Sequence, residues 1–265
     1  MNTNIEFASP DTTTETTPWV TPRKSAYQDL VLKPEYEARR LRFPVGTTWL
    51  RIVPALQSSM HGWMFPIHVL NFEGGRFAHP KTLRKNAKSV FDHAYEWAKE
   101  HHPDSLYRKE NKTGARFLTD PMCVFWTIVE EGGKHVARLL LASGYDGSRG
   151  GVPGLGYQIW RMTRERDETG ALVADAVAPD AGVLVSIEKT QPKGAKYPSY
   201  ALRLGRQPAP MNALLSKMEA GEVGALCPLE NVVRELTHEE EWRCLERVIA
   251  PDTVTEIRTS LTPAK

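Results

Sequence analysis

The sequence lacks paired cysteines, long apolar runs and a strong excess of either charge. Its three cysteines, Cys123, Cys227 and Cys244, lie far apart, and no two have the C-x-x-C spacing of a metal pair. An odd number of isolated thiols is typical of a reducing compartment. No apolar run reaches the roughly 20 residues that a membrane-spanning helix needs, and the polar, Thr-rich start does not resemble a secretory signal. We therefore expect a soluble cytoplasmic protein that does not associate with a membrane.

Signatures of catalysis are also missing. No Ser/His/Asp or Cys/His arrangement stands out, and carboxylates are not clustered as in a metal-dependent nuclease. The histidines of the middle region have irregular spacing and no cysteine partners, which argues against zinc. These histidines are His79, His93, His101 and His102. We expect a protein that is not an enzyme and that holds no metal or cofactor.

The glycine-rich segment 143–156 follows a strand-like run and precedes a helix-like one, as phosphate-binding loops do. It has no Gly-Lys-Ser/Thr ending, and Ile159 stands where the dinucleotide fingerprint needs its third glycine. A flexible connector is the favoured interpretation. If the segment binds phosphate, Ser148, Arg149 and backbone amides would serve a polynucleotide rather than a cofactor.

The net charge of +2 hides an asymmetry along the chain. Residues 182–206 carry five Lys and Arg against one acid, whereas residues 211–249 carry eight Glu against four Lys and Arg. The body is therefore basic and the C-terminal third acidic. A basic body is compatible with a nucleic-acid partner, although the total charge does not require one.

Aromatic and β-branched residues concentrate in several short runs, which favours strands. Residues 49–56, 63–72 and 76–79 predict a three-stranded antiparallel meander. Residues 122–130 and 135–143 predict a hairpin closed by two glycines, and residues 183–190 and 197–204 predict a second. The fold class is thus mainly β (α+β).

Cations and aromatic residues are interleaved in the meander, as on a surface that stacks bases and neutralises phosphates. Strand alternation places Trp49 and Arg51 on one face, which we expect to be open and to face DNA. The candidate DNA-binding residues of the meander are Trp49, Arg51, Trp63, His68, Arg76 and His79.

Helical spacing follows over residues 81–102, and Pro103 ends it. Four cations and no acid occupy its first half, where they oppose the helix dipole unless an anion meets them. These cations are Lys81, Arg84, Lys85 and Lys88. The last hairpin adds a second mixed patch of Lys193, Lys196, Tyr197, Tyr200 and Arg203.

Other helices are expected outside these segments. Residues 27–40 favour a short helix, and residues 157–168 a second. Asn212 is a candidate cap for a short helix in the acidic third. Thr237 and Glu240 form a capping box for a helix that runs to about residue 248.

The order of these parts resembles the single-stranded-DNA-binding replication proteins of tailed phages. The likeness covers residues 41–206 and rests on the phrases WLRIVPA, HVLNF, VFWTIVEE, QIW and VLVSIEKTQPKGAKYPSYALRLG. It implies a five-stranded OB-fold barrel with a helical insertion at about residues 80–120 and a cleft that tracks single-stranded DNA. A flexible arm, residues 1–40, would precede this core, and a C-terminal helical region with a tail, residues 207–265, would contact proteins. The prototype insertion holds zinc through His and Cys, but this insertion has no cysteine.

The resemblance implies a protein that coats and protects single-stranded DNA and removes its secondary structure during phage replication or recombination, in the host cytoplasm. Replication or recombination proteins are the implied partners, with cooperative self-association on DNA. The alternative is a transcription co-activator, or another protein-interaction module, that contacts host RNA polymerase through its C-terminus, where Lys265 would take part. A nuclease is the third hypothesis, which the scattered carboxylates disfavour.

Overall fold

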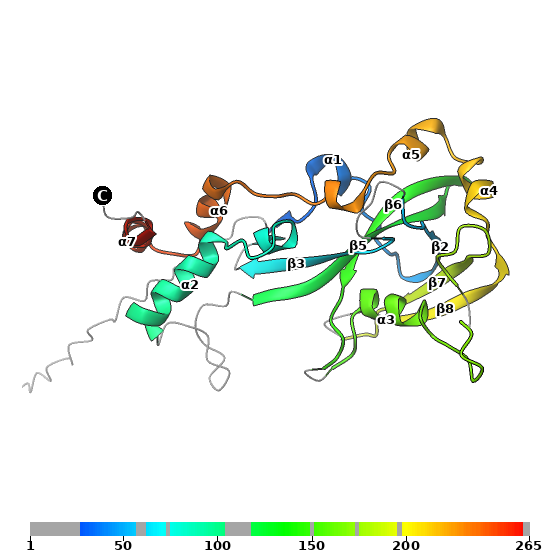
Figure 1. Ribbon diagram of the computed structural model, residues 1–265, viewed down its shortest axis with the longest axis horizontal. Coiled ribbons are helices and arrows are strands. Elements are labelled where there is room, and N and C mark those ends of the chain that lie inside the picture. The colour runs from blue at the N-terminus through cyan, green and yellow to red at the C-terminus, as the bar shows by residue number, and fades with distance from the viewer. Residues whose placement is uncertain are drawn as a thin grey trace, which may run out of the picture.

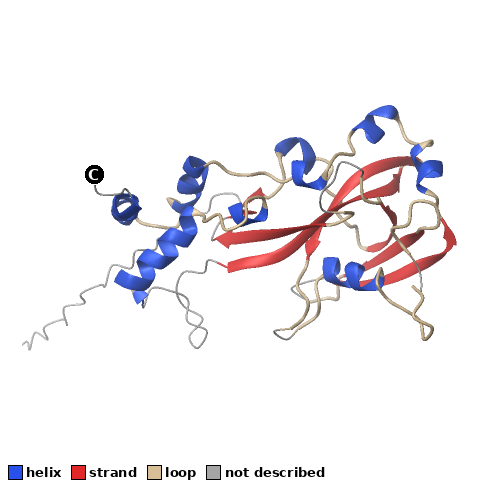
Figure 2. Cartoon of the chain, viewed as in Figure 1, coloured by secondary structure: helices blue, strands red, loops and turns tan. Residues whose placement is uncertain are grey.

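The computed structural model describes residues 27–56, 62–72, 75–103, 118–148, 151–172, 175–194 and 198–261. Most of the expected N-terminal arm, much of the expected insertion, and Arg149, Lys196, Tyr197 and Lys265 lie outside these residues. The described residues form one mostly antiparallel sheet of eight strands with seven α-helices around it (Figures 1 and 2). No helix in the described part of the chain is long and apolar enough to cross a membrane.

The strands are β1 (Gln28–Leu30), β2 (Gly46–Ile52), β3 (Phe65–Phe72), β4 (Gly75–Ala78), β5 (Leu118–Glu131), β6 (Lys134–Ser143), β7 (Val183–Thr190) and β8 (Ser199–Pro208). The helices are α1 (Pro34–Glu37), α2 (Val90–His101), α3 (Leu155–Met162), α4 (Met211–Leu215), α5 (Ala220–Gly224), α6 (His238–Leu245) and α7 (Pro251–Leu261).

Strand β5 connects the two halves of the sheet. One edge of β5 pairs with β6, and its other edge is shared by β3 over the first half and by β2 over residues 127–129. β2 then pairs with β7, and β7 with β8. The sheet order is therefore β1-β4-β3-β5-β2-β7-β8, with β6 on the free side of β5.

The prediction of a three-stranded meander is only partly confirmed. β3 and β4 form the expected antiparallel hairpin, but β2 does not pair with β3, because β5 lies between them. Each segment has the composition of a strand, so its local pattern was read correctly. The neighbour of β2 is decided by long-range pairing, which local pattern does not contain.

Both other predicted hairpins are confirmed. The turn between β5 and β6 uses Gly132 and Gly133, both with positive φ (58° and 78°), a conformation that glycine adopts without strain. β7 and β8 pair from Val183 to Thr190, with a bulge near Val185. Val185 and Ile187 are fully buried on one side of β7, and Ser186 between them is also buried (4% exposed).

The helix predicted over residues 81–102 begins later, at Val90. Ser89 caps it: its Oγ accepts the Phe91 N–H, and its own N–H donates to Asp92 Oδ2 at 2.8 Å, which completes a capping box. Asn86, with φ of 64°, interrupts the helical path before that cap. The four cations thus lie in a 3₁₀ turn and loop before α2, not at its N-terminus.

Three smaller helix predictions need correction. Residues 27–40 form β1 and the four-residue α1 instead of one helix. α3 begins two residues earlier than predicted and ends at Met162. Pro210, not Asn212, is the N-cap of α4. The capping box of Thr237 and Glu240 is confirmed, but α6 ends at Leu245 and a further helix, α7, follows.

Buried apolar residues form two clusters. The larger cluster lies along β2, β3, β5, β6 and β7 and includes the underside of α3. The smaller one joins β3 and β4 to α2, α6 and α7 through Phe72, Phe77, Phe91 and Trp242. As a result, α2, α6 and α7 gather at one end of the long axis, and β7 and β8 lie at the other (Figure 1).

Candidate nucleic-acid interface

Trp49 and Arg203 lie in one row across three strands. Trp49 on β2 is the register partner of Ser186 on β7, and Ser186 is the partner of Arg203 on β8. Residues that pair directly across strands project to the same face of the sheet. Half of the Trp49 surface (50%) is exposed, which is unusual for a ring of this size on a central strand.

The row lines a groove of about 590 Å³, here called the Trp49 groove. Its cations are Arg203 and Arg206, and its acid is Glu188, whose Oε2 lies 3.9 Å from Arg203 Nη2. The Arg203 side chain is 78% exposed, so this ion pair leaves the guanidinium open to a ligand. The lining residues are Thr47, Trp49, Ser186, Glu188, Ala201, Arg203, Leu204, Gly205 and Arg206.

The alternation of β2 explains why Trp49 is outside. Thr47 and Trp49 are exposed, whereas Leu50 and Ile52 are fully buried in the larger apolar cluster. The alternation of β2 therefore places Trp49 on the solvent-exposed face of the sheet and the aliphatic residues on the buried face. This confirms the exposed orientation predicted for Trp49.

The orientation predicted for Arg51 is wrong. Arg51 is fully buried, and its guanidinium donates to the carbonyl oxygens of Ile52 (2.6 Å), Ala176 (2.5 Å), Ala178 and Ala209 (3.0 Å). Burial lowers the pKa of Arg51 from its ordinary value. The guanidinium bridges the loops around Ala176 and Ala209 at the end of β2, and its full burial prevents contact with DNA at the surface.

Arg76 and His79 are also committed to the fold. Arg76 donates to Asp29 Oδ2 through Nη2 (2.6 Å) and Nε (3.0 Å). His79 is 3% exposed; its Nδ1 accepts the Lys81 N–H, so its Nε2 donates to Asp92 Oδ2 at 2.9 Å. The predicted contacts of these two side chains with DNA are therefore wrong. Both side chains make hydrogen bonds within the fold instead.

Two further aromatic candidates pack inside. Trp63 is partly buried and meets Phe125 edge-on, with ring centroids 5.5 Å apart. Tyr200 lies on the opposite face of β8 from Arg203, where its ring meets Phe43 at 6.1 Å. Burial raises the pKa of the Tyr200 hydroxyl. Neither ring lines the Trp49 groove.

Lys193 lies exposed in the loop between β7 and β8. The loop joins β7 to β8, the strand that carries both Arg203 and Arg206, but Lys193 does not line the Trp49 groove. The neighbouring Lys196 and Tyr197 fall outside the described residues.

The α2 basic cluster, defined by Lys81, Arg84, Lys85 and Lys88, is a separate surface. Arg84, Lys85 and Lys88 are exposed, and Lys81 is partly exposed. His68 is exposed beside it, and its pKa is lowered by burial and by Lys81, so the ring is neutral at pH 7. A neutral His68 could stack with a base but would not neutralise a phosphate.

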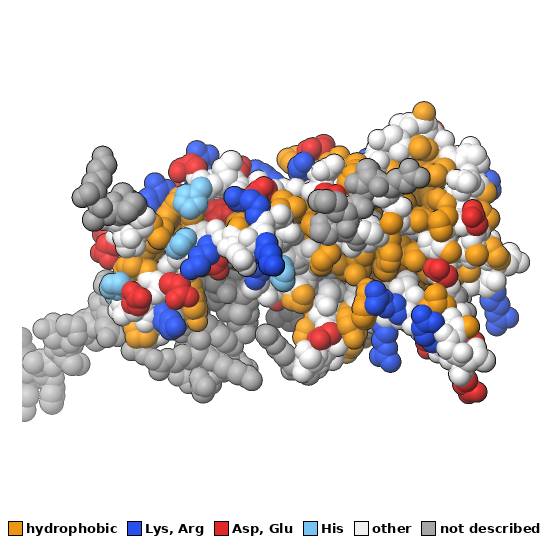
Figure 3. Space-filling view, viewed as in Figure 1, with side chains coloured by type: hydrophobic (Ala, Val, Ile, Leu, Met, Phe, Trp, Pro, Cys, Tyr) orange, Lys and Arg blue, Asp and Glu red, His pale blue; other side chains and the backbone are white. Residues whose placement is uncertain are grey.

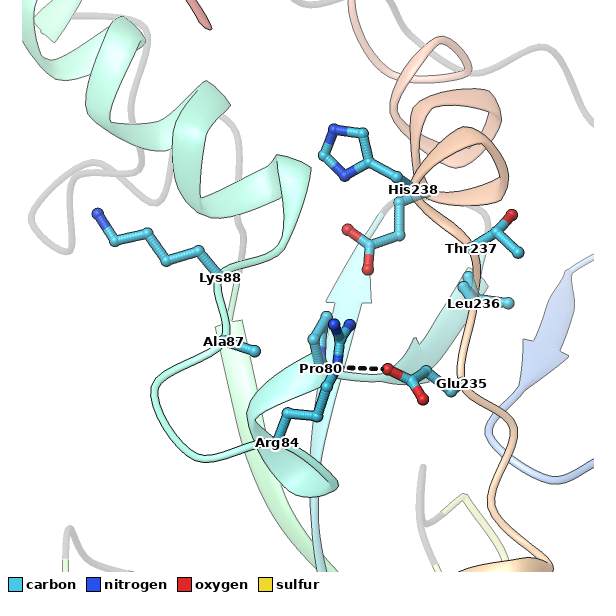
Figure 4. Close-up of a pocket in the computed structure, with 9 residues that line it drawn as sticks. Pro80, Arg84, Ala87, Lys88, Glu235, Leu236, Thr237 and His238 are labelled. Atoms are coloured by element: carbon cyan, nitrogen blue, oxygen red, sulfur yellow. Dashed lines mark ion pairs between the residues drawn. The ribbon is translucent and has the colours of Figure 1, made fainter.

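Arg84 and Lys88 line a hollow of about 530 Å³ between the loop before α2 and the start of α6; Arg84 points toward Glu235, and the Lys88 side chain extends away from it (Figure 4). Arg84 Nε lies 2.7 Å from Glu235 Oε1, and Lys88 is on the opposite wall from Glu235. Glu241, 3% exposed, reaches the base of α2 and accepts from the Val90 N–H at 2.8 Å. Arg84 is thus paired with Glu235, whereas Glu241 accepts hydrogen bonds from Ser89 and Val90 at the N-terminus of α2.

The structure does not bring the two basic surfaces together. The α2 basic cluster lies at the α2 and α6 end of the molecule, and the Trp49 groove lies on β2, β7 and β8 at the other end (Figure 1). The α2 cations therefore lie apart from Arg203 and Arg206, and the two groups form separate candidate surfaces.

Arg206 was missed as a site residue, although its signal was present in the basic composition of residues 182–206. The β-bulge near Val185 shifts the register of β8 there, so simple alternation does not place Arg206. Its position in the groove emerges only from the folded hairpin.

Metal and thiol chemistry find no support in the described residues. No group of three or more His, Cys, Asp or Glu side chains is placed to hold a metal ion there. Burial raises the pKa of the Cys123 thiol to about 12 and that of Cys244 to about 11, so both are protonated at neutral pH.

The sequence matches no protein-family model and no curated protein.

Proposed function

We propose that the protein binds single-stranded DNA through the Trp49 groove. The observation that carries the proposal is the row of Trp49 and Arg203 across β2, β7 and β8, with Arg206 beside it in one open groove. A base stacked on an exposed indole contributes about 1–3 kcal/mol without sequence preference. Adjacent guanidinium groups add phosphate contacts whose strength depends on salt.

The strand connectivity supports an OB-fold interpretation of the core. β5 and β6 form one hairpin, β7 and β8 form another, and β2 pairs with a strand of each. α3 connects the two hairpins in sequence and packs against both β6 and β8. An OB fold is a five-stranded, partly open barrel with this kind of arrangement. In this interpretation the insertion between β2 and β5 includes β3 and β4 as well as α2, so it begins before the expected residue 80.

The proposed role is to coat, protect and unfold single strands, in keeping with the resemblance to phage replication proteins. Stacking on Trp49 needs an unstacked base, which a single strand offers and a duplex does not. The proposal includes no catalytic step.

Titration of a labelled oligo(dT) of about 20 nucleotides, followed by fluorescence anisotropy, tests the proposal. We expect binding at low salt that weakens linearly in log–log form as salt rises, with a duplex of equal length competing poorly. Absence of binding at low salt would rule the proposal out. Incubation of the same oligonucleotide with Mg²⁺ separates binding from a nuclease, because we expect no cleavage.

A second, compatible role is protein contact through the C-terminal region. α7, the last described helix, lies at the opposite end of the long axis from β7 and β8, so a partner held there would not obstruct the groove (Figure 1). Removal of residues 262–265 tests the transcription role of this region. Loss of polymerase activation with DNA binding retained would support that role, and full activation would exclude it.

A further inference from the structure

One face of α3 carries a stripe of aromatic and basic residues that the Trp49 groove does not include. Tyr157, Trp160, Arg161 and Arg164 follow the spacing i, i+3, i+4 and i+7, which places them on one side of a helix. Arg164 directly follows the Thr163 C-cap and continues the stripe by one residue. All four side chains are partly or fully exposed.

The members of the stripe are stacked on one another. The Tyr157 and Trp160 rings have centroids 5.5 Å apart and planes inclined by 31°. The Arg164 guanidinium carbon lies 4.6 Å from the centre of the Trp160 ring. A guanidinium over an indole forms a flat cationic surface, the kind of platform that stacks a base and attracts a phosphate together.

The fold does not need this stripe for its core. The opposite side of α3 holds Leu155 and Ile159, which are buried in the larger apolar cluster. Gly156 lies so close to Cys123 and Ser143 that a β-carbon would not fit, which seats the helix tightly on β5 and β6. The helix is therefore fixed by one face and presents the other to solvent.

The positive charge of the α3 stripe indicates an anionic partner. α3 itself contains no acid, and neither Arg161 nor Arg164 has an ion-pair partner among the described residues. The acids that follow are Glu165, Asp167 and Glu168, all exposed; Asp167 Oδ1 accepts from the Thr169 hydroxyl and from backbone N–H groups. In the space-filling view, Lys and Arg side chains lie around the place of α3, with acidic side chains among them (Figure 3).

Position connects the stripe to the groove. α3 packs against β8, the strand that carries Arg203 and Arg206. We propose that a single strand seated in the Trp49 groove continues across β8 and stacks a further base on the Tyr157–Trp160–Arg164 platform, with Arg161 at its phosphate. This inference rests on the proposed function and lengthens the DNA path that it defines.

The test uses full-length protein and oligo(dT) of about 5 and about 20 nucleotides, since single OB folds cover roughly 4–16. The variants are Trp160→Leu, Trp160→Phe, and Arg161→Ala with Arg164→Ala. Lys217→Ala is the matched control, because Lys217 is an exposed cation that lines neither surface. Circular dichroism and urea midpoints establish that each variant is folded.

We expect Trp160→Leu to weaken binding of the longer oligonucleotide about fivefold or more, and Trp160→Phe to restore most of the loss. The double Arg variant is expected to reduce the slope of log affinity against log salt by about 0.7, because the phosphate contact of Arg161 disappears. The affinity gained on lengthening the oligonucleotide falls in both cases.

The outcomes separate the two proposals. If Trp49→Ala weakens binding and the α3 variants do not, the α3 platform is overturned and the groove stands. If no variant of either surface weakens binding, the proposed function fails as well. An equal loss in Lys217→Ala would show a general charge effect and would overturn the α3 platform.

Discussion

Trp49 and Arg51 project to the same side of β2, but only Trp49 reaches solvent. The loops around Ala176 and Ala209 lie over the end of the strand, and their carbonyl oxygens take the donors of the Arg51 guanidinium. The loop around Ala176 is also held by Asp175, whose Oδ1 accepts hydrogen bonds from the N–H groups of Val177 and Ala178. Arg51 is thus a structural residue, which stabilises the end of β2, the strand that carries Trp49.

Arg51→Met is expected to lower the free energy of unfolding by about 3 kcal/mol, because several buried carbonyl groups lose their donor. The matched control is Arg203→Met, which removes the same group from an exposed position and should change stability by less than about 0.5 kcal/mol. Urea denaturation measures both. Equal stability of the two variants would contradict the structural role of Arg51.

Asp29 links β1 to β4 and gives stability a pH dependence. Burial raises the pKa of Asp29, but the hydrogen bonds from Arg76 and Arg40 outweigh it and hold the pKa below the ordinary value. A carboxyl with a depressed pKa contributes stability above its unfolded-state value, about 3.9, and loses it as pH falls through the native value.

Asp29→Asn should therefore destabilise the protein at pH 7, by about 1–3 kcal/mol, and much less near pH 3. Urea midpoints of both proteins across this range check the prediction. A stability difference that does not shrink as pH falls would show that the Asp29 charge is not what stabilises this contact.

At the scale of elements, hairpins were predictable and their arrangement was not. The paired glycines at 132–133 fix a tight turn, so β5 and β6 follow from local sequence alone. The place of β2 between β5 and β7 depends on pairing across more than 70 and more than 130 residues, which no local pattern encodes. For the same reason, the sequence indicated both groups of cations, the α2 basic cluster and the cations of the β7–β8 hairpin. It did not indicate that the two groups lie far apart in the fold.

The predicted start of α2 is wrong, although the sequence contains the signal for a start at Val90. Ser89 and Asp92 have the spacing of a capping box, which local reasoning could have found. The third partner could not have been found: Glu241, from α6, accepts the Ser89 hydroxyl at 2.7 Å across 152 residues of chain. This contact ties α6 to α2.

Ser89→Ala is expected to destabilise the protein by about 2 kcal/mol, because it removes the cap and one donor to a buried carboxylate. Burial raises the pKa of Glu241, and loss of the Ser89 donor raises it further, so the cost should be larger at pH 7 than at pH 4. Thermal or urea unfolding at both pH values measures this. Ser216→Ala, at an exposed serine, is the control and should be near neutral.

At the scale of the whole molecule, two basic surfaces lie at opposite ends of one long sheet (Figure 1). Of these two surfaces, the Trp49 groove combines cations with an exposed indole, whereas Arg84 in the α2 basic cluster is paired with Glu235. We therefore expect mutations at the two surfaces to have different effects on DNA binding. Lys85→Ala should leave binding of a short oligonucleotide unchanged, because Lys85 lies outside the groove.

The most direct test of the central claim is the affinity of Trp49→Ala, and of Arg203→Ala with Arg206→Ala, for oligo(dT) as a function of salt. We predict that Trp49→Ala weakens binding about fivefold or more at every salt concentration, since stacking is not ionic. The double Arg variant should reduce the slope of log affinity against log salt by about 1.4. Wild-type affinity and slope in both folded variants would contradict the assignment of the Trp49 groove as the DNA-binding site.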